Sequence, residues 1–142
     1  MQRPVFKVRA MRTTLIMVGV FFLVVSFSAV SSFAVGRDIV GTYSDLKFNQ
    51  QGGDLLGVEL RIVMTRNGYQ GVVQFAEGGP GELILVNVQV DGKRIKFVIP
   101  DDNSNAGSFS GVIGNGVLTG HFQYKGGGAE DVVLKKGKSY WD

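Results

Sequence analysis

The sequence has no cysteine, one histidine and three prolines in 142 residues. The absence of cysteine excludes disulfide bonds, a thiol nucleophile and zinc sites built on thiolates. A single histidine excludes metal sites that need several imidazole ligands. The length allows one domain and leaves little room for a second. Whole classes of enzyme and metalloprotein are therefore excluded before any motif is considered.

Acidic residues are absent from the first 34 positions, which contain four basic residues. A mostly apolar run from Thr13 to Val30 follows, and Ser32 and Ala34 place small side chains before a cleavage point after Ala34. This order is typical of a secretory signal peptide. We therefore expect residues 1–34 to be a signal peptide and residues 35–142 to be a single exported domain, periplasmic or secreted. The alternative is an uncleaved anchor in the inner membrane formed by residues 13–34, because an apolar run of about 18 residues is at the short limit of a spanning helix.

The excess positive charge belongs to this leader. The whole sequence has a formal net charge of +3, whereas residues 35–142 hold eleven basic and twelve acidic residues, a net charge of −1. A near-neutral domain has no electrostatic reason to bind nucleic acid. We expect no nucleic-acid partner, and a membrane contact only if the leader is retained.

Helical periodicity is also absent from residues 35–142, where short alternating apolar and polar runs are separated by Gly, Asn and Asp. Turns such as Asn67-Gly68 and Asp91-Gly92 favour antiparallel pairing of successive strands. We expect an all-β fold, a small eight-stranded antiparallel up-and-down β-barrel, because closure removes exposed strand edges. A small β-sandwich is the alternative. The eight predicted strands are 39–48, 55–64, 69–75, 83–90, 94–99, 108–113, 117–124 and 129–134.

One apolar face of these strands defines the expected barrel interior. An eight-stranded barrel is filled by side chains or holds one small ligand. Gly71, Gly111 and Gly120 recur in mid-strand between apolar residues, and the bends of tightly coiled strands explain them. A ligand lying against the bare backbone is the alternative explanation. The residues expected to line the interior are Leu60, Ile62, Val86, Val88, Phe97 and Phe122.

Residues with catalytic or metal-binding potential are few. His121 is in mid-strand, and no serine on a strand-to-helix elbow accompanies it. Residues 101–105 match the first ligand positions of a calcium-binding loop, but the glycine and the bidentate glutamate of such a loop are missing. We expect no catalytic residue, no metal site and no cofactor. An enzyme would need Asp101 or Asp102 to meet His121 in a cleft.

The C-terminus ends with Tyr140 and Trp141, after a short basic cluster at 135–138. Two adjacent exposed aromatic residues are unusual, so we expect them to pack against something. The tail could fold back and plug one end of the barrel. Alternatively, Tyr140 and Trp141 contact a partner or a membrane surface, helped by the lysines.

Several short motifs carry a family resemblance. These include Gly41-Thr42-Tyr43, the strand Leu60-x-Ile62 and the hairpin from Asn87 to Phe97. The segment 41–135 resembles β-rich modules of secreted bacterial proteins, whose function is generally unassigned. It is also similar to calycin-type barrels, the lipocalins and avidins, which begin with a Gly-x-Trp element where this chain has Tyr43. The resemblance implies an antiparallel barrel.

Two functions follow as expectations. The first is a non-enzymatic binding module that holds a small apolar ligand in the barrel interior. The second is a structural or interaction protein of the periplasm or cell surface that uses the rim loops 77–81 and 101–107 and the aromatic tail. A filled core with exposed aromatic residues would favour the second function.

Overall fold

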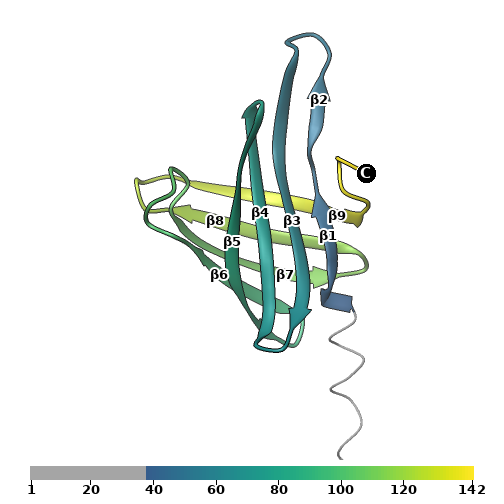
Figure 1. Ribbon diagram of the computed structural model, residues 1–142, viewed down its shortest axis with the longest axis vertical. Coiled ribbons are helices and arrows are strands. Elements are labelled where there is room, and N and C mark those ends of the chain that lie inside the picture. Colours follow the sequence, from purple (N-terminus) through teal and green to yellow (C-terminus); the bar gives the residue numbers. More distant parts are fainter. Residues whose placement is uncertain (1–37) are drawn as a thin grey trace, which may run out of the picture. The chain divides into compact units, whose positions relative to one another are not determined.

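The described part of the protein is built from antiparallel strands. The computed structural model describes residues 38–142, and Figure 1 shows the nine strands that follow one another in this range. The strands are β1 (Gly41–Ser44), β2 (Lys47–Asn49), β3 (Asp54–Thr65), β4 (Gly68–Gly78), β5 (Pro80–Asp91), β6 (Arg94–Ile99), β7 (Gly107–Gly114), β8 (Val117–Tyr124) and β9 (Ala129–Gly137). The predicted leader lies outside the described residues.

β1 closes the sheet into a barrel. Each strand from β3 to β9 pairs antiparallel with the next, and β1 pairs with both β3 and β9. β2 pairs only with β3 and extends that hairpin beyond the barrel (Figure 1). The prediction of an all-β, closed, eight-stranded antiparallel barrel is therefore confirmed, with β2 as one extra strand.

The first predicted strand, residues 39–48, is interrupted in the structure. Ile39 lies in a short helical turn, and β1 ends at Ser44. The Asp45 carboxylate Oδ1 accepts a hydrogen bond of 2.7 Å from the Val58 backbone N–H. A side-chain oxygen therefore takes the position of a ladder carbonyl, opposite Gly57 with its φ of 115°. The polar residue at this position divides one predicted strand into β1 and β2.

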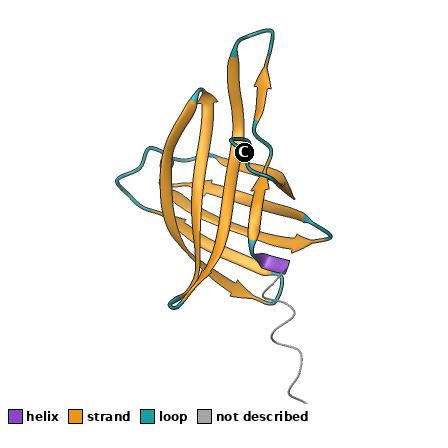
Figure 2. Cartoon of the chain, turned by 45° about the vertical axis from the view of Figure 1, so that its right-hand side comes forward, coloured by secondary structure: helices purple, strands orange, loops and turns teal. Residues whose placement is uncertain are grey.

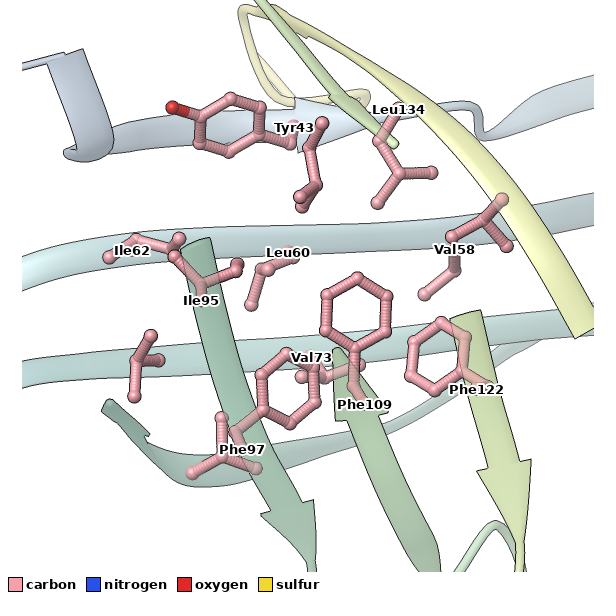
Figure 3. Close-up of a cluster of buried hydrophobic side chains, with 14 of the residues drawn as sticks. Tyr43, Val58, Leu60, Ile62, Val73, Ile95, Phe97, Phe109, Phe122 and Leu134 are labelled. Carbon is pink, nitrogen blue, oxygen red and sulfur yellow. The ribbon is translucent and has the colours of Figure 1, made fainter. Parts of the chain in front are cut away.

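The barrel interior is packed with aromatic rings (Figure 3). The rings of Phe97 and Phe109 stack with centroids 4.8 Å apart, and Phe109 lies 4.6 Å from Phe122. Gly120 faces this cluster, because a Cβ atom built there would overlap the Phe109 ring. Gly111 lies against the same ring. These glycines thus make room for a neighbouring aromatic side chain, which is a structural role different from the strand bending that we expected.

The wall is incomplete between β5 and β6. β5 has twelve residues and β6 has six, and only three pairs join them, at Gln89–Lys96, Val90–Ile95 and Asp91–Arg94. Beyond Lys96 the strands diverge: in Figures 1 and 2, β3 to β5 rise together while β6 to β9 run across them. We call this opening, bounded by residues 80–88 of β5 and 97–99 of β6, the β5–β6 seam.

Candidate functional site

The residues expected to line a ligand cavity lie in the protein core. All six are buried and belong to one hydrophobic cluster. The most exposed of them is Val88, at 6%. Tyr43 and Phe109 join the same cluster (Figure 3), as does Phe75. The structure therefore brings the six residues together inside the barrel, where they contact one another and neighbouring core side chains.

A groove at the β5–β6 seam reaches this core from outside. Its volume is about 550 Å³, and its walls include Leu85 from β5, Val98 from β6 and Ser110 from β7. The stacked rings of Phe97 and Phe109 form part of the lining. Lys96, at the end where the two strands converge, is the single charged residue of the lining. The groove is thus an opening in the wall whose lining is apolar at Phe97, Phe109 and Val98 and polar at Asn87, Gln89 and the serines of β7.

The β5 side of the seam carries unpaired backbone groups. Asp91 and Arg94 flank a two-residue turn and form a hydrogen-bonded pair, and such pairs alternate along antiparallel strands. By this alternation, the N–H and C=O groups of Leu83, Leu85 and Asn87 point toward β6, which has already diverged. The side chains of Leu83 and Leu85 are 69% and 65% exposed. This part of β5 is an open apolar sheet edge.

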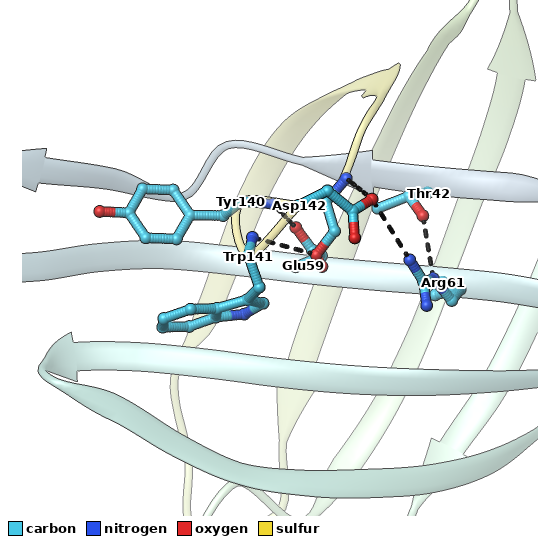
Figure 4. Close-up of polar contacts among 7 residues, drawn as sticks. Thr42, Glu59, Arg61, Tyr140, Trp141 and Asp142 are labelled. Carbon is cyan, nitrogen blue, oxygen red and sulfur yellow. Dashed lines mark hydrogen bonds and ion pairs between the residues drawn. The ribbon is translucent and has the colours of Figure 1, made fainter.

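The C-terminal tail lies on the outer wall next to this edge. Glu59 of β3 is 7% exposed, and its carboxylate accepts hydrogen bonds from Ser139 Oγ (2.6 Å) and the Tyr140 backbone N–H (2.9 Å). Figure 4 shows the tail held against Glu59. Trp141 Nε1 also donates to Gln74 Oε1 at 2.8 Å. Gln74 is the cross-strand neighbour of Leu83. The tail therefore places its aromatic residues one strand from the open edge.

The plug interpretation of the tail is wrong. Glu59 alternates with the buried Val58 and Leu60, so its side chain points away from the barrel interior. Asp142 adds an ion pair with Arg61 on the same outer face, at 3.8 Å. Hydrogen bonds to the outward-facing carboxylate of Glu59 therefore hold the tail on the outer wall, and not at the barrel end. Tyr140 and Trp141 stay 42% and 53% exposed there.

The two predicted rim loops meet at one end of the barrel. They line a polar cleft of about 600 Å³ with Glu77, Glu82 and Asp102 on its walls. The first loop is shorter than predicted, because β4 continues to Gly78 and β5 begins at Pro80.

Among residues 38–142, no three His, Cys, Asp or Glu side chains are close enough to hold a metal ion. Asp101, the first residue of the partial calcium-loop match, pairs with Lys125 at 2.7 Å.

His121 is paired, but with a residue that we did not predict. Its Nδ1 lies 2.7 Å from Asp131 Oδ1, on the outer face of β8 and β9. Ser110 is the cross-strand neighbour of His121 on the other side, so a Ser–His–Asp row crosses three strands. No hydrogen bond between Ser110 and His121 occurs in the described structure, and the backbone around Ser110 is engaged in the β6–β7 and β7–β8 ladders. The row lacks the oxyanion-binding donors that acyl transfer needs.

Two tyrosines have perturbed ionisation. Burial, and next the charge of Asp38, raise the pKa of Tyr43 to about 12. The Tyr43 hydroxyl donates to the backbone carbonyls of Asp38 and Ile39, which ties the helical turn to β1. Burial, and next its hydrogen bond to Glu130, raise the pKa of Tyr124 well above the ordinary value. Both hydroxyls act as structural donors.

Sequence reasoning missed the seam and the His121–Asp131 pair. The pair could have been found, because the two residues lie at equal distances from the turn that joins β8 to β9. The seam has a weaker signal: the predicted strand at 83–90 is longer than its partner at 94–99, and its first turn-distal residues include the outward Leu83 and Leu85. Length mismatch alone does not say where a hairpin opens.

Comparison of the chain with protein-family models, with curated proteins and with solved structures gives no match. In residues 38–142, no helix has the length and apolar character that crossing a membrane requires.

Proposed function

We propose that this domain is an exported, non-enzymatic interaction module that docks other proteins on one part of its outer wall. The docking surface comprises the β5 side of the seam and the neighbouring aromatic tail. The observation that carries the proposal is the open edge of β5, where Leu83, Leu85 and Asn87 present unpaired backbone groups beside exposed leucines. An edge of this kind favours addition of a further strand.

The packed interior supports this choice over a ligand carrier. The six residues once expected to line a cavity are in contact with other core side chains, and Phe109 fills the space that Gly111 and Gly120 leave. A protein that acts through its surface needs such a solid core as a rigid support. The exposed Tyr140 and Trp141 add the aromatic contacts that are enriched at protein interfaces.

A small apolar ligand is the second candidate, and the seam groove favours it. The groove reaches Phe97 and Phe109 from solvent, so an apolar molecule could enter there if the two rings moved apart. Native mass spectrometry of protein purified from its own cells tests this candidate. A bound species that is lost in a Phe97→Trp variant, but kept in a Val133→Thr variant of the opposite wall, would favour the ligand over docking.

The proposal also includes export of the domain from the cytoplasm and a relationship to calycin-type barrels. The basic and apolar pattern of residues 1–34 supports delivery to the periplasm or the cell exterior. The closed eight-stranded meander, with Tyr43 buried at its start, supports kinship with calycin-type barrels. N-terminal sequencing of the protein from its own cells tests the leader: a chain that begins at Val35 agrees with cleavage, and one that begins at Met1 contradicts it.

Site-specific photo-crosslinking in cells tests the docking surface. A photoreactive amino acid replaces Leu85 at the open edge or, as a matched control, Val133, an equally outward residue that is 57% exposed on β9. We expect a discrete crosslinked product from position 85 and none from position 133. Equal labelling from both positions, or no product from position 85, would contradict the proposal.

A further inference from the structure

The open edge of β5 is self-complementary about Ile84. Leu83 and Leu85 flank Ile84 on either side, and both side chains point outward while Ile84 is 7% exposed. A second β5 strand that runs antiparallel, with its Ile84 opposite this Ile84, would place its Leu85 opposite Leu83 and its Leu83 opposite Leu85. Each exposed leucine would then be covered by the other leucine of an identical strand.

We propose that the occupant of this edge is a second copy of this chain, joined by antiparallel pairing of β5 with β5 about a two-fold axis at Ile84. The inference rests on the proposed function, in which this edge is the docking surface. In this register Leu83 pairs with the partner's Leu85 and Gly81 with the partner's Asn87. Leu83, Leu85 and Asn87 are the positions whose backbone groups point into the seam, so the pairing supplies hydrogen bonds that β6 leaves unmade. The Gly81 carbonyl already accepts a hydrogen bond of 3.0 Å from Gln74 Nε2, so it is not one of the unpaired acceptors.

The length of the edge fits this occupant. The free edge runs from Pro80 to Val88, because Gln89 is already paired with Lys96. A strand centred on Ile84 can therefore extend four residues in each direction, and β5 offers the same nine residues, 80–88, on both copies. A longer added strand would collide with β6 at Lys96.

The charge distribution also fits a copy better than a charged peptide. Residues 83–90 of β5 contain no charged side chain. The single charge on the free edge, Glu82, would lie opposite the partner's Val86, so two identical strands meet without like charges in register. An acidic or basic peptide would find no opposite charge along the leucines.

The symmetry of this pairing limits its extent. A two-fold interface uses the same surface on both subunits, so one dimer covers both open β5 edges and leaves none of them for a third copy. The seam would thus be closed by association, as natural proteins commonly protect sheet edges. A peptide from another protein would leave the association state of the chain unchanged.

Sedimentation velocity tests the second copy. Protein expressed from the full sequence is purified, its mass is measured to define its N-terminus, and its sedimentation is followed up to about 1 mM, the weak end of specific association. We expect a monomer–dimer equilibrium that is lost in a Leu83→Lys/Leu85→Lys variant. A Val133→Lys variant should dimerise as the unchanged chain does. A monomer at every concentration, or a dimer that survives the double substitution, would overturn the inference.

Disulfide trapping tests the register, because the chain has no cysteine of its own. A Leu83→Cys protein is mixed with a Leu85→Cys protein of different mass under mild oxidation. Pairing about Ile84 predicts the mixed disulfide as the main product. A Leu85→Cys homodimer as the main product would overturn the register in favour of an axis at Leu85.

The photo-crosslinking described above separates the failure of this inference from that of the proposed function. A product from position 85 with twice the mass of the chain agrees with the second copy. A product with a different protein, together with monomeric sedimentation, overturns the second copy and leaves the docking function standing. No product at all contradicts both.

Discussion

The two places where the barrel wall must close differ sharply. At the closure between the first and last described strands, β1 pairs with β3 on one side and β9 on the other. The tail then covers the outer face of the same region through Glu59. At the seam, two consecutive strands share three pairs and then diverge. β1 and β9, which are far apart in the sequence, are thus paired, whereas β5 and β6, which are consecutive, separate along most of β5. The opening is therefore specific to the β5 edge.

A proline in the sealed wall should have the largest effect. Thr119 is an exposed residue of β8, and the alternation from the Gly114–Val117 turn makes its N–H part of the ladder to β7. We expect Thr119→Pro to lower the free energy of unfolding by about 3 kcal/mol or more. Leu85→Pro, at the edge where the N–H is unpaired, should cost less than about 1 kcal/mol.

Urea denaturation of both variants checks this comparison. Each is followed by far-ultraviolet circular dichroism beside the unchanged chain. Equal losses of stability would mean that Leu85 is paired within its own chain, and the open seam would be contradicted.

Filling a glycine under the core should have the next largest effect. Gly120→Ala places a Cβ atom against the Phe109 ring, and we expect a loss of about 1–3 kcal/mol from overpacking. Gly126→Ala is the matched control, because nothing lies within 4 Å of a Cβ atom there. Phe109→Leu should partly rescue Gly120→Ala in thermal unfolding. Failure of the rescue would contradict the contact between the ring and the glycine.

Loss of the tail's anchor should have a smaller effect. Glu59→Ala removes the acceptor of two tail hydrogen bonds whose donors water can then satisfy, and we expect a loss of about 0.5–1.5 kcal/mol. Trp141 is the single tryptophan of the sequence, so its fluorescence reports the tail directly. We expect a red-shifted emission in Glu59→Ala and faster proteolysis after Gly137. Glu130→Ala removes an exposed glutamate of β9 that accepts from Tyr124 and not from the tail, so it should leave the emission unchanged. A shift in this variant as well would argue against a specific anchor.

The ionisation of Tyr43 should have the smallest effect on stability near neutral pH, because it changes stability only under alkaline conditions. Tyr43 has a pKa raised from 10.0 to about 12 in the folded protein. The neutral form is favoured by folding, so its contribution to stability is fully present below about pH 10 and is lost as the pH rises toward 12. The urea midpoint should fall across this range. Tyr43→Phe should flatten that part of the pH dependence while lowering stability at neutral pH; an unchanged slope would contradict burial of the hydroxyl.

Much of the fold could be predicted from the sequence, because the relevant signals are local. Asn67-Gly68 and Asp91-Gly92 fix two hairpins, and alternation such as Val58, Leu60 and Ile62 fixes which face is buried. Closure of the meander follows from avoiding free edges. These rules depend on neighbours within a few residues, which is why they held for every strand except the first.

The candidate site was harder to predict, because it depends on contacts between distant residues. Glu59 looks like an ordinary outward residue until the tail, eighty residues later, covers it. The pairing of β5 with β6 stops at Gln89 and Lys96, and no glycine or proline marks that point in either strand. We expected Tyr140 and Trp141 to pack at one end of the barrel, whereas contacts with Glu59 and Gln74 hold the tail on the outer wall.

Residue-resolved amide hydrogen exchange tests the open edge most directly. The account predicts that, in dilute protein, the amides of Leu83, Leu85 and Asn87 exchange rapidly, while those of Ile84 and Val86, bonded to β4, stay protected. With rising concentration the three fast amides should gain protection as the second copy pairs. Equal protection of odd and even positions in dilute monomer would show that the barrel wall is sealed there, and would contradict the account.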